Sequence, residues 1–316
     1  MKIYKHLDRT VWLFGGGLIG GNVSNYLAKL CDYRFDSVKV LWNDLEYIST
    51  IVGQIISRSN LSHDETCKIS LVWAAGKSGF YSSVQEVKIE FIYFQKLIDC
   101  LLRSINNLPI DAVFVSSAGG LYEGSINISR KTKISIKRPY GKLKKKQEGY
   151  LLSNSRFDKV SIIRPSSVYG YINTKNRMGL IPTMIYNALT SKSTILYGNL
   201  YTLRDYVWAD DVAKFIFNKI FFDGSGIYIL ANCKPSSILE IKREVEKITR
   251  RKVLFKMNNS MENNADITFS NYLPLSTWDP INISAGISKV LIKQADHLQS
   301  PQKSMLNKSR VFFKKI

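Results

Sequence analysis

A tyrosine and a lysine stand four residues apart in a strongly basic stretch of the chain. Residues 138–150 read RPYGKLKKKQEGY, and Pro139 suits the first turn of a helix. Tyr140 and Lys144 would then lie one turn apart on the same helix face. The phenol of a free tyrosine has a pKa of about 10, so it needs a nearby cation to act as a base at neutral pH. Lys144 would supply that cation.

Two serines could hold the oxygen of a substrate for this pair. The apolar run DAVFV at residues 111–115 ends at Ser116 and Ser117, and it is typical of a buried strand. Loops at strand ends commonly carry functional groups. A Tyr-x-x-x-Lys spacing alone occurs by chance, with a solvated lysine face as the alternative interpretation. A strand-end serine upstream and a glycine turn near the N-terminus make that coincidence improbable.

The glycine turn lies in FGGGLIGG, residues 14–21, where Gly15, Gly17 and Gly20 match G-x-G-x-x-G. An apolar run precedes the turn and a helical pattern follows it. The first glycine permits a tight turn, the second permits close approach of a pyrophosphate, and the third permits packing of the helix against the strand. The strand-turn-helix context predicts a dinucleotide-binding site.

The acid that would bind the adenosine ribose is harder to place. A second strand is expected at residues 37–42 (SVKVLW), and Asp44 is the nearest carboxylate, slightly later than usual. Trp42 occupies the position where the acid is expected. Because no arginine or lysine follows immediately to take a 2′-phosphate, the segment favours NAD over NADP without excluding NADP.

These residues must be positioned by alternating strands and helices. Further apolar runs lie at residues 69–76, 111–117 and 160–164, and a long amphipathic helix is expected at 84–102. Continuous apolar runs are typical of parallel strands covered on both faces. We therefore predict an α/β fold with a Rossmann-type doubly wound parallel sheet, whose ligands bind at the carboxyl ends of the strands.

The C-terminal half predicts a smaller substrate-binding domain. Helices are expected near residues 178–190 and 237–250, the second with Ser237 and Glu240 as a capping box. The predicted boundaries are 1–165 for the NAD(P)-binding domain with a returning segment near 203–232, 166–202 and 233–294 for the substrate domain, and 295–316 for a loose basic tail.

Composition limits the other classes of function. The 316 residues are 45% hydrophobic and carry a net charge of +20. Four cysteines without ligand spacing and three scattered histidines argue against a metal site and fit a reduced cytoplasmic protein. No run reaches the roughly 18 apolar residues of a membrane span. The charge would attract polyanions, but no nucleic-acid-binding motif is present, and lysines spread over a solvated surface explain it better.

Together these segments resemble the extended short-chain dehydrogenase/reductases of the NAD-dependent epimerase/dehydratase family, which act on nucleotide sugars. The resemblance runs from about Val11 to Leu291. VFVSSAGGLYEG (113–124) is similar to the family's serine loop and RPYGKLKKKQEGYL (138–151) to its catalytic helix. RPSSVYG (164–170) resembles the segment that faces the sugar nucleotide, and LRDYVWADDVAKFI (203–216) the segment whose arginine meets the substrate diphosphate.

The resemblance implies a role for each matching residue. Tyr140 would be the acid/base, and Lys144 its electrostatic partner that also grips the nicotinamide ribose. The family often places its catalytic Ser or Thr four residues before the loop tyrosine, which is Ala118 here, so Ser117 is preferred and Ser116 is the reserve. The predicted cofactor contacts are Gly15, Gly17, Leu18, Ile19, Gly20, Asp44, Ala75, Gly76, Tyr140, Lys144 and Arg164. The predicted substrate contacts are Ser116, Ser117, Ser167 (where the family often has asparagine) and Arg204.

The resemblance also limits the reaction. The 4,6-dehydratases carry an Asp-Glu pair after the catalytic threonine, and residues 118–120 (AGG) have no such groups, which disfavours dehydration. A C4 epimerase that retains NAD is preferred, with an NAD(P)H-dependent 4-keto-sugar reductase as the alternative. A non-catalytic dinucleotide-sensing or RNA-binding protein is the alternative from another class. The family implies a homodimer and a role in making surface polysaccharide precursors.

Overall fold

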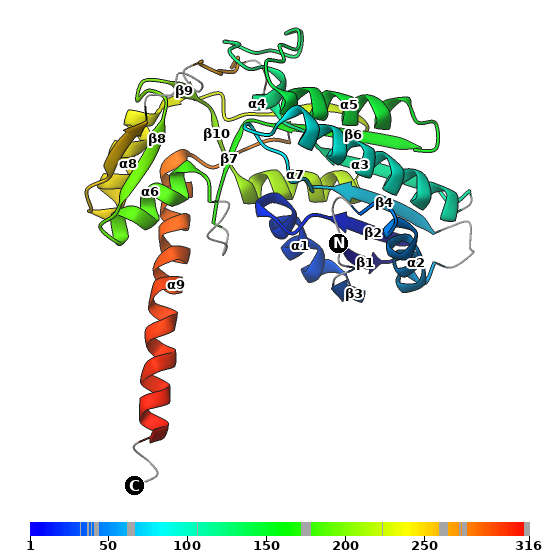
Figure 1. Ribbon diagram of the computed structural model, residues 1–316, viewed down its shortest axis with the longest axis horizontal. Coiled ribbons are helices and arrows are strands. Elements are labelled where there is room, and N and C mark those ends of the chain that lie inside the picture. The colour runs from blue at the N-terminus through cyan, green and yellow to red at the C-terminus, as the bar shows by residue number, and fades with distance from the viewer. Residues whose placement is uncertain are drawn as a thin grey trace. The chain divides into compact units, whose positions relative to one another are not determined.

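The computed structural model describes two compact units. It covers residues 1–316 except 32, 37, 39, 41–43, 62–66, 106, 172–177, 223, 259–264, 272, 274–276 and 313–316, and gives only the backbone of 33–36 and 299–312. The first unit comprises Met1–Val168, Asp205–Pro235 and Asp266–Pro280; the second comprises Tyr169–Arg204, Ser236–Ala265 and Ile281–Ile316 (Figure 1). The return of 266–280 to the first unit is absent from the predicted boundaries.

A seven-stranded sheet forms the centre of the first unit. Its order is β11-β6-β5-β4-β2-β1-β3, and β2, β4, β5, β6 and β11 run parallel. The predicted α/β fold with a parallel sheet is confirmed. The strands are β1 (Lys2–His6), β2 (Arg9–Phe14), β3 (Tyr33–Asp36), β4 (Lys68–Trp73), β5 (Ile110–Val115), β6 (Lys159–Pro165) and β11 (Gly226–Leu230).

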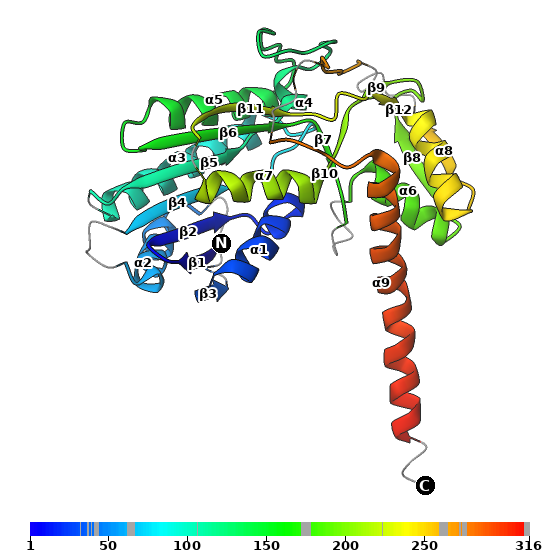
Figure 2. The ribbon, with the colours of Figure 1, turned by 180° about the vertical axis from the view of Figure 1, so that it is seen from behind.

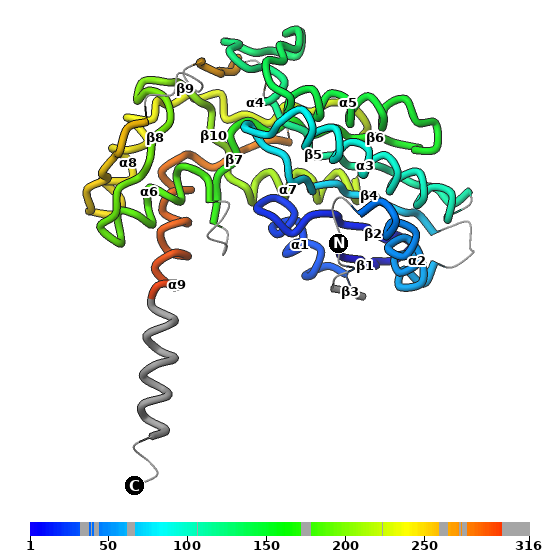
Figure 3. The backbone as a smooth tube through the Cα atoms, in the orientation of Figure 1, coloured from blue at the N-terminus to red at the C-terminus, as the bar shows by residue number. Residues whose placement is uncertain are grey.

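Strand β1 was not predicted from the sequence. It pairs antiparallel with β2 on one side and with β3 on the other, and Ile3 and Tyr4 are fully buried. In a doubly wound sheet the next strand of the chain normally lies beside the strand of the glycine turn. Here β1 separates them in the strand order. The backbone trace shows β1 beside β2 (Figure 3). The strand predicted at 37–42 lies largely outside the described residues, and β3 precedes it.

Helices cover both faces of this sheet. Side chains of α1 (Leu18–Leu30) and α7 (Ala209–Phe221) pack on one face, and these two helices lie side by side (Figure 2). The other face packs against α2 (Ile48–Ser59), α3 (Val84–Ser104) and α5 (Pro139–Ser153). Phe14 and Trp73 stack there with ring centroids 4.9 Å apart. Each such buried side chain contributes roughly 1.5–3 kcal/mol, so this layer fixes the strand ends firmly.

The described residues of the second unit form helices and short strands. They are α6 (Leu180–Leu189), α8 (Ile238–Thr249), α9 (Ile283–Phe312), the parallel pair β8 (Ser193–Tyr197) and β13 (Leu254–Asn258), and the pair β9 (Leu203–Arg204) and β12 (Ser236–Ser237). The Ser237–Glu240 capping box of α8 is present as predicted. Helix α9 extends into the segment where a loose tail was expected. The short pair β7 (Ser167–Tyr169) and β10 (Tyr206–Trp208) completes the strands described. None of the described helices is both long and apolar enough to cross a membrane.

Candidate active site at the carboxyl edge of the sheet

The glycine turn between β2 and α1 is tightly packed at Gly15 and Gly20 and open at Gly17. Gly15 has φ +115°, and a Cβ there would lie 2.3 Å from the carbonyl oxygen of Ala74 at the end of β4. A Cβ on Gly20 would lie 2.2 Å from the carbonyl oxygen of Gly15, whereas one on Gly17 would meet nothing within 4 Å. The first N–H groups of a helix lack intrahelical partners and bind anions. The turn therefore fits the pyrophosphate of a dinucleotide, with Leu18 and Ile19 opening the helix beside it.

The predicted tyrosine and lysine share one face of α5. Pro139 is the first residue of the helix, as expected. The Nζ atom of Lys144 lies 5.8 Å from the ring centroid of Tyr140 and 4.9 Å from that of Phe114. It also donates a hydrogen bond of 3.2 Å to the carbonyl oxygen of Val115, at the end of β5. Lys144 is thus anchored at the strand edge and points its charge toward the phenol.

The two serines after β5 face different partners. Ser117 caps the short helix α4 (Ala118–Leu121) by accepting a 3.1 Å hydrogen bond from the N–H of Gly120, and its side chain also hydrogen-bonds Tyr140, which lowers the pKa of that phenol. The hydroxyl of Ser116 instead donates a 2.6 Å bond to Oε1 of the buried Glu148. The geometry therefore favours Ser117 over Ser116 as the hydroxyl beside the reacting atoms.

Burial moves the pKa values of Tyr140 and Lys144 in opposite directions. Desolvation raises the pKa of Tyr140 to about 12, against a lowering by Ser117, while the carboxylate of Glu90 adds to the rise. Desolvation lowers the pKa of Lys144 to about 8, against raising effects of Glu90 and Glu148. A phenol with so high a pKa is a proton donor, and added positive charge is what converts it into a base. A bound nicotinamide ring would bring such a charge.

A buried ion pair between Glu148 and Arg164 joins helix α5 to strand β6. The carboxylate of Glu148 accepts bonds from Nε (2.9 Å) and Nη2 (2.6 Å) of Arg164, and the two side chains are 0% and 6% exposed. The Nη1 atom of Arg164 donates to the hydroxyl of Tyr122 at 2.7 Å. The guanidinium of Arg164 is thus held by Glu148 and Tyr122, and its predicted contact with the cofactor stays a prediction. Glu148 was not predicted from the sequence, although it stands one helical turn beyond Lys144.

A second buried carboxylate, Glu90, holds the loop that follows β4. It lies on the inner face of α3 and accepts bonds from the N–H groups of Lys77 (2.9 Å) and Ser78 (2.7 Å). Ala75 and Gly76 begin this loop, so these two predicted cofactor residues lie at the same sheet edge as the glycine turn. No sequence pattern marks Glu90, which stands among the apolar residues of an amphipathic helix.

The model of the NAD dependent epimerase/dehydratase family matches residues 14–219, more than half of the chain. The chain belongs to this family. A candidate UDP-glucose 4-epimerase of Methanocaldococcus jannaschii is 31% identical over 120 residues, which are 36% of this chain and 39% of that protein. The match therefore spans well under half of the relative.

Solved epimerase structures share the fold of this family member. The UDP-glucose 4-epimerase of Thermotoga maritima with UDP-glucose has a TM-score of 0.71 at 17% identity, covering 91% of this chain and 99% of that one. The UDP-glucose 4-epimerase of Thermus thermophilus with NAD has a TM-score of 0.70 at 20% identity, covering 90% and 97%. The resemblance inferred from the sequence is confirmed, and this epimerase/dehydratase family member is an NAD-dependent enzyme.

Three predicted residues are not joined to the Tyr140 site by the contacts described. Asp44 is exposed, and its Oδ1 accepts a 3.1 Å bond from the N–H of Tyr47 at the start of α2; Trp42 lies outside the described residues. The N–H of Ser167 donates to the carbonyl oxygen of Asp205 at 3.0 Å. In the second unit, Arg204 donates to the carbonyl oxygens of Leu203 and Ala265. Their ligand contacts remain predictions.

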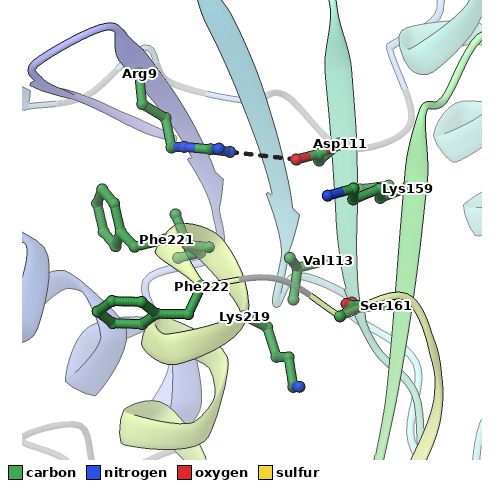
Figure 4. Close-up of a pocket in the computed structure, with 11 residues that line it drawn as sticks. Arg9, Asp111, Val113, Lys159, Ser161, Lys219, Phe221 and Phe222 are labelled. Carbon is green, nitrogen blue, oxygen red and sulfur yellow. Dashed lines mark hydrogen bonds and ion pairs between the residues drawn. The ribbon is translucent and has the colours of Figure 1, made fainter.

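The amino edge of the sheet carries a different charged cluster. Asp111 lies 3.3 Å from Nη1 of Arg9 and 3.1 Å from Nζ of Lys68. Figure 4 shows Arg9, Asp111 and Lys159 at the rim of a pocket that Lys219 also lines. No residue predicted for catalysis lines this pocket. In the described part of the family member, no group of three or more His, Cys, Asp or Glu could hold a metal ion.

Proposed function

We propose that this family member catalyses C4 epimerisation of a UDP-sugar, by transient hydride transfer to bound NAD, in the synthesis of surface polysaccharide precursors. The observation that carries the proposal is the meeting of Ser117, Tyr140 and Lys144 at the carboxyl edge of the sheet, where the glycine turn also lies. The names of the similar structures support the choice of sugar nucleotide.

Each of the three residues has one task in this proposal. NAD, when bound, supplies reversible acceptance of a hydride. Ser117 holds the C4 oxygen by a hydrogen bond, and Tyr140 removes the hydroxyl proton as the carbonyl forms and returns it as the second epimer forms. Lys144 stabilises the phenolate through its charge. Because the same proton and hydride go back to the sugar, the reaction is redox-neutral.

The loop after Ser117 supports epimerisation over dehydration. A Cβ on Gly120 would lie 3.0 Å from the ring of Tyr140, and one on Gly119 would lie 3.4 Å from the ring of Phe80. The ring of Tyr140 therefore leaves little room for a side chain at Gly120, whereas a Cβ on Gly119 would make an ordinary contact. Neither glycine offers an acid/base group to expel a second hydroxyl. The site has what one alcohol oxidation and its reversal require.

Two measurements on the purified protein test the proposal. Mass spectrometry of the nucleotides released on denaturation should find retained NAD. Proton NMR of UDP-glucose incubated without added cofactor should show UDP-galactose forming until an equilibrium mixture is reached. An empty protein that instead consumes NADPH with a 4-keto-sugar nucleotide would identify a reductase and refute the epimerase. We also propose a homodimer, which light scattering tests.

The Tyr140→Phe variant tests the catalytic assignment. We expect turnover to fall by about 10²–10⁴-fold, since the proton carrier is lost. Retained NAD should persist, because the glycine turn and the loop after β4 are untouched. Tyr122→Phe is the matched control, since it removes a buried phenol hydroxyl that is held by Arg164. Wild-type turnover in Tyr140→Phe would show that another group moves the proton.

A further inference from the structure

Glu90 is a buried carboxylate that the proposed reaction does not use. The residue is 5% exposed, and its Oε2 accepts hydrogen bonds from two consecutive backbone N–H groups, those of Lys77 and Ser78. A Cβ on Gly76 would lie 2.7 Å from Oε1, so the other oxygen fills the space beneath that glycine. The carboxylate therefore clamps residues 76–78, the loop that leaves β4 at the edge where the cofactor is expected.

The negative charge of Glu90 also acts on the catalytic helix. Helices α3 and α5 pack against each other, and Glu90 raises the pKa values of both Tyr140 and Lys144. Lys144 is 5% exposed, and its described contacts are a carbonyl oxygen and two aromatic rings. A buried ammonium is costly unless a carboxylate compensates it. One compensating charge is therefore required nearby.

Two carboxylates could provide that compensation, and one of them is already matched. Glu148 forms two charge-assisted hydrogen bonds with Arg164 and accepts a third bond from Ser116. The hydrogen bonds of Glu90 come from neutral backbone N–H groups, which leaves its full charge uncompensated. Glu90 is accordingly the carboxylate without a paired cation, on a helix that packs against the one carrying Lys144.

We propose that Glu90 is a positioning residue for the epimerisation: its carboxylate holds the loop 76–78 and balances the ammonium of Lys144 beside Tyr140. The role of Glu90 in catalysis rests on the proposed function, whereas its effect on the charge of Lys144 can be measured without any substrate. The charged and titratable groups on the elements around it include Tyr140, Lys144 and Glu148 on α5, Arg164 on β6, Lys77 on the loop, Asp44 before α2, and Glu86 and Tyr93 on α3.

The first test follows the titration of Lys144 in the protein without substrate. Trace acetylation with acetic anhydride across a pH series, read at Lys144 by peptide mass spectrometry, gives the midpoint of its ammonium. In the wild type we expect this midpoint near the lowered pKa of about 8. In Glu90→Gln it should fall by about one pH unit, because an opposite charge is lost. Glu86→Gln removes an exposed carboxylate from the same helix and should leave the midpoint unchanged.

The second test separates the charge of Glu90 from its hold on the loop. In Glu90→Gln, both limbs of the pH profile of kcat/KM should move to lower pH by about one unit, since Tyr140 and Lys144 both lose a charge that raises their pKa values. In Glu90→Asp the charge stays but the loop bonds are lost. The profile should then stay in place, while calorimetry shows weaker binding of NAD, by about tenfold.

The outcomes distinguish the inference from the function on which it rests. A Lys144 midpoint that does not move in Glu90→Gln overturns the proposal, and so does reduced NAD binding with an unshifted pH profile, which would reveal a purely structural residue. If Glu90→Gln does not fold, the pair Glu90→Asp and Glu90→Asn makes the same comparison at equal length. If the wild type shows no epimerase turnover, the proposed function fails, and the Lys144 midpoint still tests the charge balance.

Discussion

An ion pair at the carboxyl edge of the sheet is buried, whereas the ion pairs at the amino edge are partly exposed to solvent. The side chains of Glu148 and Arg164 are 0% and 6% exposed. Those of Asp111, Arg9 and Lys68 are 13%, 17% and 24% exposed. Buried pairs cost much to desolvate and much to break, whereas partly hydrated pairs contribute little. The same chemical interaction therefore fixes geometry at one edge and is replaceable at the other.

Breaking the buried pair should give the largest effect. Glu148→Gln removes the charge that compensates Arg164 and leaves a buried guanidinium without its ion partner. We expect the free energy of unfolding to fall by about 3 kcal/mol, as measured by urea denaturation. Glu123→Gln, which alters the less buried ion pair with Arg138 (side chains 9% and 17% exposed), is the control and should cost less. A loss of stability below about 1 kcal/mol in Glu148→Gln would mean that this pair contributes no more than the partly exposed pairs of the amino edge.

The glycine turn contains a similar contrast, between the crowded Gly20 and the open Gly17. Gly20→Ala drives a Cβ to within 2.2 Å of the backbone oxygen of Gly15, so stability should fall by about 2 kcal/mol. A Cβ on Gly17 meets open space, so Gly17→Ala should leave the melting temperature nearly unchanged and still abolish retention of NAD. Equal melting temperatures for the two variants would contradict the packing described.

The depressed pKa of Lys144 predicts a pH dependence of stability. Between about pH 8 and 10.5 the unfolded chain binds a proton at this lysine that the folded chain lacks, so the group makes stability rise with pH. From about pH 8.5 to 9.5 the contribution is about 1 kcal/mol. The difference in unfolding free energy between wild type and Lys144→Met, measured across this range, should show that rise. A flat difference would mean that Lys144 titrates normally.

Replacing the shared carboxylate at the amino edge should give the smallest effect. Asp111→Asn removes the partner of Arg9 and Lys68, yet all three side chains keep contact with water. We expect a loss of no more than about 1 kcal/mol that shrinks further in high salt. Retained NAD and epimerase turnover should stay at the wild-type level. A fall in turnover would show that the two edges are coupled.

The sequence was sufficient where local spacing decides the structure. The glycine turn, the helix that carries Tyr140 and Lys144, and the capping box of α8 follow from patterns a few residues long. It did not give the contacts between side chains that are distant in the chain. The roles of Arg164 and Glu90 depend on which groups the packing of α5 and the loop after β4 brings beside them. Strand β1 was missed because KIYKH is short and basic with only two large apolar residues, and these two are buried by pairing with strands on both edges.

The position of β1 has a consequence for how the sheet assembles. Parallel neighbours such as β2 and β4 pair Arg9 with Lys68, so their contact requires closure of a long loop. Strands β1 and β2 are instead joined by a tight turn at Leu7 and Asp8, with His6 opposite Arg9. Contacts between close neighbours in the chain form early, because little chain entropy opposes them. We therefore expect the β1–β2 hairpin to form before the parallel contacts, so that the strand preceding the glycine turn is in place when the remaining strands add to it.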